Sequence, residues 1–293
     1  MQKVLENKIA SLAIVFVAYL IAIAAGVCSY LFISIEAVVW LRLLLADVIA
    51  TTVIFIFSLI FKNASMYDAY WSVQPLVIVL GFFVSYKITI FSILALIATF
   101  VWGIRLTINW IYTFDNLKWQ DWRYKMLKEN TKKFYPIINY LGIHMFPTLV
   151  VYSVVVPIVY GIVIGPDPNA ATFIFFVTAI LSTVLQGTAD YQMHKYRKNR
   201  TTPFIRTGLW KYSRHPNYLG EITMWWSMGL MATISINSGM MYLFLIGALV
   251  NTIMFLVVSI PLADKRQSRK EGFEQYKKET FMLLPIKKYC KKD

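Results

Sequence analysis

A short run in the last third of the chain combines cationic, imidazole, amide and carboxylate side chains. It reads Gly208-Leu-Trp-Lys-Tyr-Ser-Arg-His-Pro-Asn-Tyr-Leu-Gly-Glu221. Pro216 suits the first turn of a helix, where its missing N–H costs nothing, and this start places Asn217 and Glu221 on one helix face. A helix start and an arginine both favour phosphate groups. The run therefore predicts a cradle for a phosphorylated cofactor; the alternative is a structural loop in which Arg214 bonds to carbonyl groups and Asn217 caps the helix.

The elements that must position this run are helices within a membrane. Of the 293 residues, 58% are hydrophobic and only 15% are charged, whereas a soluble domain carries about 25% charged residues. The apolar blocks reach about 18 residues or more, which is long enough to cross a bilayer. We therefore expect an all-α, polytopic transmembrane helical bundle of about seven or eight helices, forming a single domain over residues 1–293. The expected blocks are 9–33, 37–61, 68–86, 89–112, 138–164, 170–190, 216–236 and 239–262.

Basic residues gather in the segments between alternate blocks. Segment 117–133 mixes lysines with apolar residues and is typical of an interfacial amphipathic helix. The other basic segments are the loop 191–215 and the tail 263–293, in which 263–280 is expected to be a helix. All of them share one side if eight blocks cross, and such segments prefer the cytoplasm. We therefore expect both termini and all basic loops in the cytoplasm, at a bacterial inner membrane or the endoplasmic reticulum; the count falls to seven if the third and fourth blocks form one bent unit.

Ionisable residues within the apolar blocks are few, which makes each one informative. They include Asp47, Asp68, Arg105, Asp190 and Glu221. Such residues are costly in lipid and mark functional sites, and all of those named except Asp47 fall in the cytoplasmic half of the expected topology. Together they predict a site that opens to the cytoplasm. The structural alternative is that Asp68 and Asp190 end helices and that Arg105 reaches the lipid headgroups.

Two classes of function are not indicated. The net charge of +14 follows from the positive cytoplasmic segments, so nucleic acid is not an expected partner. The three histidines, His144, His194 and His215, are dispersed and show no spacing typical of metal ligands. No metal is expected.

The run from Gly208 to Glu221, followed by the pair Trp225-Trp226, is similar to the signature of the steroid 5-alpha-reductase-like membrane reductases, in particular of the branch known as DUF1295. Asp121-Trp-Arg-Tyr124 also resembles a recurrent feature of this branch. The likeness is clearest from Asp190 onward. The shorter core Arg-His-Pro-x-Tyr-x-Gly is also similar to the cofactor segment of isoprenylcysteine carboxyl methyltransferases and phospholipid methyltransferases.

The resemblance implies a substrate side in the N-terminal helices, 1–113, and a cofactor-binding half over 138–293. The residues expected to bind NADPH are Arg105, Asp190, Arg197, Arg214, His215, Asn217, Tyr218, Glu221, Lys265 and Arg269. On the substrate side, the family pairs an embedded acid with a tyrosine, and both polarise the substrate carbonyl. Asp68 lies where that acid belongs, and Glu221 is the alternative. Trp102 occupies the position that matches the tyrosine, so Tyr70 or Tyr112 is expected to replace it.

The expected function is the NADPH-dependent reduction of a carbon–carbon double bond conjugated to a carbonyl, in a lipophilic substrate that is steroid-like or isoprenoid. NADPH carries about four negative charges, and arginine side chains suit its phosphates. One alternative is an S-adenosylmethionine-dependent methyltransferase acting on a lipid or a prenyl-cysteine carboxylate. Another is a lipid-binding membrane protein without catalysis. The lipid bilayer is an expected partner in each case.

Overall fold

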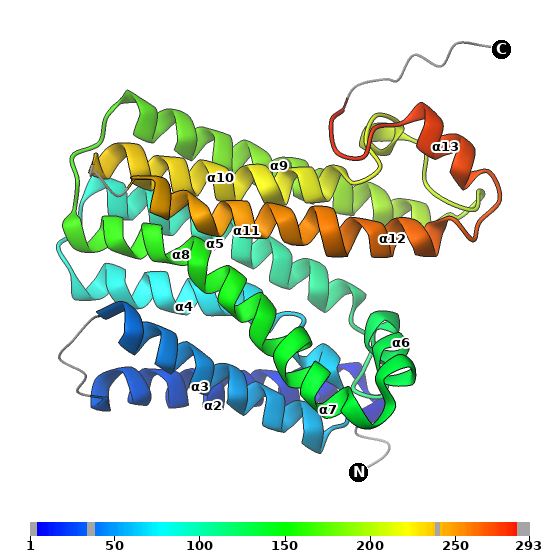
Figure 1. The fold of residues 1–293 in the computed structure, drawn as a ribbon, viewed down its shortest axis with the longest axis horizontal. Coiled ribbons are helices and arrows are strands. Elements are labelled where there is room, and N and C mark those ends of the chain that lie inside the picture. Colours follow the sequence, from blue (N-terminus) through cyan, green and yellow to red (C-terminus); the bar gives the residue numbers. More distant parts are fainter. Residues whose placement is uncertain (1–4, 34–38, 238–240, 286–293) are drawn as a thin grey trace. The chain divides into compact units, whose positions relative to one another are not determined.

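A computed structural model describes residues 5–33, 39–237 and 241–285, and within these ranges the regular structure is helical (Figure 1). One isolated parallel bridge joins Ser213 to Phe281. The α-helices are α2 (Lys8–Phe32), α3 (Val39–Ile60), α4 (Tyr70–Ser85), α5 (Ile90–Thr113), α6 (Trp122–Thr131), α7 (Tyr135–Ile138), α8 (Phe146–Ile164), α9 (Ala170–Lys198), α10 (Pro216–Ile236), α11 (Ile246–Met254), α12 (Ile260–Gln267) and α13 (Phe273–Glu279). Short 3₁₀ or π segments connect several of them, notably η1 (Ala64–Tyr67) and η3 (Asn139–Met145).

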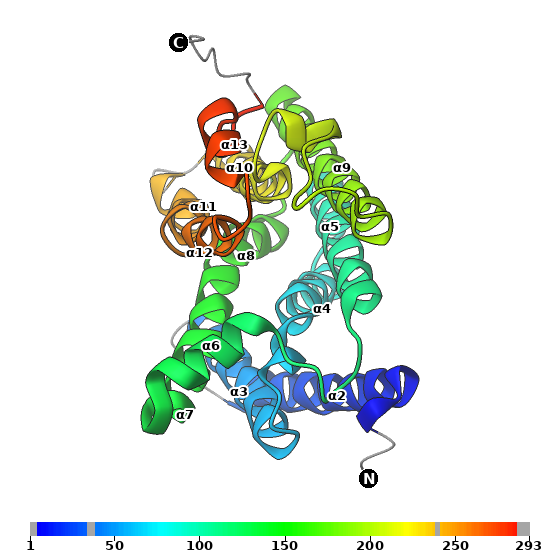
Figure 2. The same cartoon turned by 90° about the vertical axis from the view of Figure 1, so that its right-hand side faces the viewer.

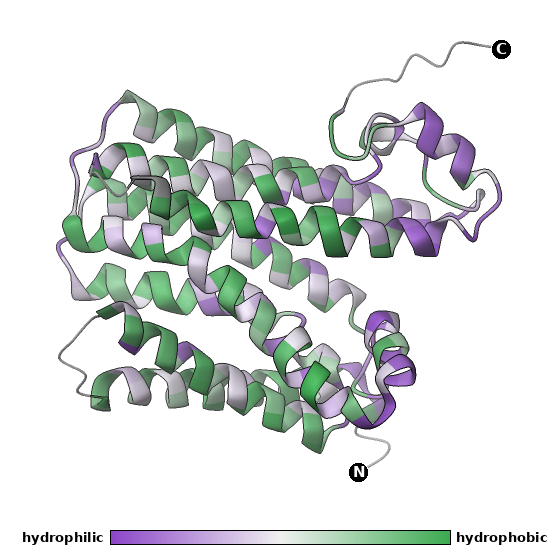
Figure 3. Cartoon of the chain, viewed as in Figure 1, coloured by the Kyte–Doolittle hydropathy of each residue, from purple (hydrophilic) through white to green (hydrophobic). Residues whose placement is uncertain are grey.

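Seven helical segments are long and apolar enough to cross a membrane, which confirms the predicted all-α, polytopic transmembrane fold. They are Lys8–Phe32, Val39–Ile60, Ala64–Ser85, Ile90–Thr113, Trp122–Ile164, Ala170–Lys198 and Leu243–Gln267. Hydrophobic residues predominate along these helices, whereas hydrophilic residues gather on α6 and α13 (Figure 3). The third and fourth blocks form separate helices, α4 and α5.

The chain divides into two compact units. Unit 1 comprises Met1–Lys87 and Gly103–Val159, and unit 2 comprises Ile88–Trp102 and Tyr160–Asp293. This division differs from the expected halves, 1–113 and 138–293, because part of α5 belongs to unit 2 and most of α8 belongs to unit 1. Hydropathy alone does not reveal which helices pack together, since lipid-facing and protein-facing residues are both apolar.

Within unit 1, α2 packs along α3, and the Tyr19 hydroxyl of α2 donates a hydrogen bond of 2.7 Å to the Met66 carbonyl. Helix α6 is shorter than the amphipathic segment predicted at 117–133. It begins at Trp122 because the Asp121 side chain accepts a hydrogen bond of 2.8 Å from the Arg123 backbone N–H, which caps the helix start.

Within unit 2, α9 and α10 lie side by side in both ribbon views (Figures 1 and 2). At one end, a Cβ atom on Gly220 would lie 2.7 Å from the Ser182 carbonyl oxygen, so only glycine permits the observed approach of the helices. At the other end, the hydroxyl groups of Thr172 and Ser235 are 2.7 Å apart. The two helices therefore run antiparallel over nearly the full length of α10.

The prediction of one helix over 263–280 is wrong. Helix α12 ends at Gln267, and α13 begins at Phe273. Between them Gly272 has a φ of 76°, a left-handed conformation that favours glycine and reverses the chain. The turn brings α13 back against the loop that precedes α10.

Candidate functional site

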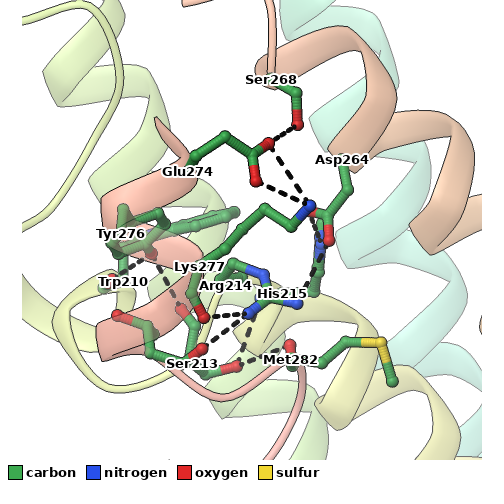
Figure 4. Close-up of polar contacts among 11 residues, drawn as sticks. Trp210, Ser213, Arg214, His215, Asp264, Ser268, Glu274, Tyr276, Lys277 and Met282 are labelled. Atoms are coloured by element: carbon green, nitrogen blue, oxygen red, sulfur yellow. Dashed lines mark hydrogen bonds and ion pairs between the residues drawn. The ribbon is translucent and has the colours of Figure 1, made fainter. Parts of the chain in front are cut away.

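The start of α10 is tied to the two C-terminal helices by hydrogen bonds and ion pairs (Figure 4). Arg214 donates to the Thr280 carbonyl at 2.6 Å and to Asp264 Oδ2 at 3.2 Å. His215 Nε2 lies 2.9 Å from Asp264 Oδ1. The buried Arg214 side chain thus joins the start of α10 to the C-terminal helices. This role agrees with the alternative in which Arg214 bonds to carbonyl groups in a structural loop. The phosphate contacts expected of Arg214 and His215 stay predictions.

The loop before α10 is folded onto α9 and α13. Trp210 donates its indole N–H to the Ala189 carbonyl at 3.1 Å and accepts a hydrogen bond from the Tyr276 hydroxyl at its own carbonyl (Figure 4). Burial raises the pKa of Tyr276, so the phenol keeps the proton that it donates. Gly208 has a φ of 61°, and a Cβ atom there would lie 2.4 Å from the Gln192 side chain. These contacts give Gly208 and Trp210 of the run a structural role.

A group of cationic side chains lies where the end of α9 approaches the turn after α12. Burial and the charges of Arg200, Arg266 and Arg197 lower the pKa of Lys270. Burial is the largest cause of this lowered pKa, and the three arginine charges add to it. We call these four residues the cation cluster; it is a region that attracts anions.

The sequence predicted only part of the cation cluster. Arg197 was expected, and its charge interacts with Asp190, an expected neighbour on α9. Lys265, Arg266 and Arg269 are all exposed, and of these three Arg266 interacts with Arg197. Lys270 was missed, because the charge density of segment 263–280 does not reveal which of its cations turns toward α9.

Glu221 is buried, with 4% of its surface exposed, and is held by two indole groups of unit 2. Trp102 Nε1 donates to both carboxylate oxygens, at 3.0 and 2.9 Å, and Trp225 Nε1 donates to Oε1 at 2.8 Å. The two rings pack edge to face with centroids 4.8 Å apart. This geometry suits a fixed hydrogen-bond acceptor better than a proton donor. Trp102, at the position where a tyrosine was expected, therefore has a role that sequence reasoning missed.

Asn217 lies one turn before Glu221, and its Oδ1 atom is buried with no hydrogen-bond partner among the described residues. A buried acceptor without a partner is costly, so Asn217 Oδ1 is suited to accept a hydrogen bond from a ligand. Tyr218 stacks on His215 with centroids 5.2 Å apart and contacts Phe255 at 4.9 Å. The start of α10 thus combines a hydrogen-bond acceptor, Asn217 Oδ1, with the packed rings of His215, Tyr218 and Phe255.

The expected substrate-side residues lie in unit 1. Asp68 follows η1 and accepts a hydrogen bond from the Tyr124 hydroxyl, and Arg123 lies 3.9 Å away. Arg123 and Tyr124 belong to the Asp121-Trp-Arg-Tyr124 sequence, so this sequence binds Asp68. Tyr70 packs instead against Tyr19, at 5.5 Å between ring centroids. Arg105 is half-buried in the part of α5 that belongs to unit 1.

A buried polar network in unit 1 was not predicted. Asp47 accepts a hydrogen bond from Gln74, while its Oδ1 atom has no hydrogen-bond partner within the described ranges. The Tyr70 hydroxyl lies close to Thr51 and to the Asp47 carboxyl group. The spacing of Asp47 and Thr51, four residues apart in an apolar block, is the signal in the sequence that could have indicated it.

The same network extends to the start of α8. Thr148 Oγ1 lies 2.7 Å from the Tyr67 hydroxyl and 3.0 Å from Thr51 Oγ1. The ring of His144 packs on Tyr67 with centroids 4.9 Å apart, and His144 Nε2 is buried with no hydrogen-bond partner in the described part of the chain. His144 and Thr148 are again four residues apart. Unit 1 therefore encloses a polar centre among apolar helices.

Comparisons with known proteins add a family and a relative. The family model described as "Protein of unknown function (DUF1295)" matches residues 54–280. The chain is also similar to the uncharacterized protein C594.04c of Schizosaccharomyces pombe, with 28% identity over 206 residues. That alignment covers 60% of this chain and 60% of the length of the yeast protein. No solved structure matches the chain.

Proposed function

The chain belongs to the DUF1295 family, and from this premise and the chemistry of unit 2 we propose that it is an NADPH-dependent membrane reductase. The proposed reaction reduces a carbon–carbon double bond conjugated to a carbonyl in a lipophilic, steroid-like or isoprenoid, substrate. NADPH, when bound, supplies the hydride. The protein supplies binding, orientation and electrostatics.

The cation cluster is the observation that carries this proposal. Burial and the charges of Arg200, Arg266 and Arg197 lower the pKa of Lys270, and an anionic ligand among these cations would offset their repulsion. Arginine side chains match the geometry of phosphate oxygens, so Arg197, Arg200 and Arg266 would hold the phosphates of the cofactor. S-Adenosylmethionine has no phosphate, so binding the cofactor of a methyltransferase would not require such a cluster.

Asn217 and Glu221 fit the other end of the same ligand. The nicotinamide group carries an amide N–H₂, and Asn217 Oδ1 is a buried acceptor that lacks a donor among the described residues. Glu221, fixed by Trp102 and Trp225, adds a second acceptor on the same helix face. These side chains would orient the cofactor rather than transfer protons.

The proposal also requires an acid that polarises the substrate carbonyl, and two aspartates are candidates. The role expected of Asp68 and Tyr70 stays a prediction, and the cation Arg123 beside Asp68 suits a charged carboxylate. Among the described contacts of Asp47 there is no cation comparable to Arg123. If Asp47 is protonated at Oδ1, which has no hydrogen-bond partner among the described residues, this O–H could donate to the substrate carbonyl. We therefore rank Asp47 as the second candidate for the acid, with Tyr70 as its neighbour.

The proposal also includes an orientation. Because positive side chains favour the cytoplasmic side of a membrane, we infer that the loop 199–215 and both termini face the cytoplasm, where NADPH is available. The membrane is a bacterial inner membrane or the endoplasmic reticulum.

Nucleotide binding to the detergent-purified protein tests the function. NADPH should bind more tightly than NADH, and salt should weaken the binding of both. Arg266→Gln and Lys270→Gln should each lower NADPH affinity by about 10- to 100-fold, the scale of a charge-assisted hydrogen bond. Lys195→Gln is the matched control, since this exposed lysine on α9 does not belong to the cation cluster. Tight binding of S-adenosylmethionine without binding of NADPH would support the methyltransferase instead, and binding of lipid alone would support the non-catalytic alternative.

A further inference from the structure

A second site lies in unit 1, separate from the residues assigned to the cofactor. A cavity of about 160 Å³ opens where the end of α3 meets α6, α7 and η3. The side chains that matter for its chemistry are Ser58, Lys62, Gln120, Lys128, Tyr135 and Asn139. The cavity is several times larger than the ~30 Å³ that one water molecule occupies in the liquid. It can therefore hold a small polar group, but not a lipid chain.

The cavity presents two positive charges and one unused acceptor. Lys62 and Lys128 have no ion pair with a carboxylate in the described part of unit 1, and Lys128 lies 5.9 Å from the centre of the Tyr135 ring. Asn139 is 3% exposed, and its Oδ1 atom has no hydrogen-bond partner there either. A ligand that fits must carry an anion for the lysines and a donor for Asn139.

Lys62 is held in a strained backbone conformation beside this cavity. Its φ is 53°, in the left-handed region that residues with a Cβ atom seldom adopt. Such strain is kept where the surrounding structure fixes the residue. Here the Asn63 side chain donates 2.7 Å hydrogen bonds to the carbonyls of both Leu117 and Trp119, which anchors the turn.

The surroundings of the cavity are those of a bilayer interface. Leu59 lines the cavity, and Ile60, Ile137 and Leu141 lie within two residues of its lining in the chain; these four side chains are between 47% and 63% exposed. Exposed apolar side chains of this kind contact acyl chains, and lysines at the same level contact headgroups. These surroundings favour an anion that is attached to a lipid.

We propose that this cavity binds the headgroup of an anionic phospholipid. The phosphate lies between Lys62 and Lys128, and a hydroxyl or amine of the headgroup donates a hydrogen bond to Asn139 Oδ1. The acyl chains remain outside, against the exposed apolar residues. The site does not depend on the proposed reductase activity, and no residue is shared between the two.

Thermal unfolding of the full-length protein in mixed micelles tests this proposal. Phosphatidylglycerol added to phosphatidylcholine micelles should raise the unfolding temperature of the parent protein, because a ligand that binds only the folded state stabilises it. Lys128→Gln and Asn139→Leu should each weaken the apparent affinity for phosphatidylglycerol about tenfold or more. Lys125→Gln and Lys133→Gln are matched controls in the same amphipathic segment and should keep the parent response.

Lys62→Gly separates the lysine side chain from folding. Glycine accepts the left-handed φ at this position, so the variant should fold at least as well as the parent and yet lose the response to phosphatidylglycerol. An equal response of the cavity variants and the control variants would overturn the proposal. A full response to inorganic phosphate alone, with none added by the lipid, would identify a free-phosphate site and would also overturn it.

Discussion

At the scale of single residues, the candidate site depends on contacts between side chains that are distant in the sequence. Trp102 and Glu221 are separated by 119 positions in the chain, yet the indole donates to both carboxylate oxygens. Two indole donors replace water around a buried carboxylate, which lowers the cost of burying it. Trp102, at a position where a tyrosine was expected to polarise the substrate, thus holds Glu221.

Lys270 provides a prediction about pH. Burial and the charges of Arg200, Arg266 and Arg197 lower its pKa in the protein without ligand. A phosphate bound among these cations raises that pKa again, because an anion favours the charged ammonium. At a pH between the pKa without ligand and the pKa with ligand, Lys270 is neutral in the free protein and charged in the complex. Binding then takes up a proton. NADPH affinity should be highest below the lowered pKa and fall as the pH rises through it.

Calorimetry in two buffers of different ionisation enthalpy measures this uptake. Lys270→Met should abolish it, and Lys195→Gln should leave it unchanged. Proton release on binding, or an uptake that persists in Lys270→Met, would show that Lys270 does not contact the ligand.

At the scale of elements, Asp68 anchors the amphipathic helix α6. It accepts a hydrogen bond from Tyr124, and both residues are largely buried. Tyr124→Phe removes this donor and keeps the Asp68 carboxyl group. We expect it to lower the free energy of unfolding by about 1.5–3 kcal/mol, the scale of a hydrogen bond to a charged group, with little effect on turnover.

Asp68→Asn tests the catalytic role against the anchor role. If Asp68 only anchors α6, the variant should lose about as much stability as Tyr124→Phe. As the catalytic acid, it should also slow hydride transfer by about 100-fold or more, measured by single-turnover NADPH oxidation beside thermal unfolding. If Asp68→Asn keeps the turnover rate of the parent but is less stable, Asp68 is only an anchor. Asp47 then becomes the candidate for the catalytic acid.

At the scale of the whole molecule, α10 decides the number of membrane crossings. It is not among the seven segments apolar enough to cross. However, its 21 residues extend about 31 Å at about 1.5 Å per residue, and it runs antiparallel to α9 from Gly220 to Ser235. A helix paired in this way crosses wherever α9 crosses, which predicts eight crossings.

Cysteine labelling in intact cells measures this topology. In a parent that lacks both natural cysteines, Asp167→Cys and Asn237→Cys should react with an impermeant reagent from outside, and Arg200→Cys should react only after permeabilisation. Labelling of Asn237→Cys together with Arg200→Cys would mean that α10 does not cross. Labelling of Arg200→Cys alone in intact cells would reverse the orientation and remove the cytoplasmic cofactor site.

The sequence by itself determined the features that depend on neighbours in the chain. Runs of apolar residues set the helices, and the block predicted at 216–236 coincides with α10 (Pro216–Ile236) because Pro216 marks its start. The spacing of Asn217 and Glu221 placed them on one face. The family, too, could be identified from a contiguous run of residues.

Only the tertiary structure decided which distant side chains meet. Asp68 meets Tyr124, Glu221 meets Trp102, and Lys270 joins the arginines of α9 and its following loop. In a membrane protein the lipid-facing and protein-facing sides of a helix are both apolar, so hydropathy carries little information about which faces pack together. The choice of one cation among many, such as Lys270 rather than Lys265, depends on the turn at Gly272, whose direction is set by packing beyond the local sequence.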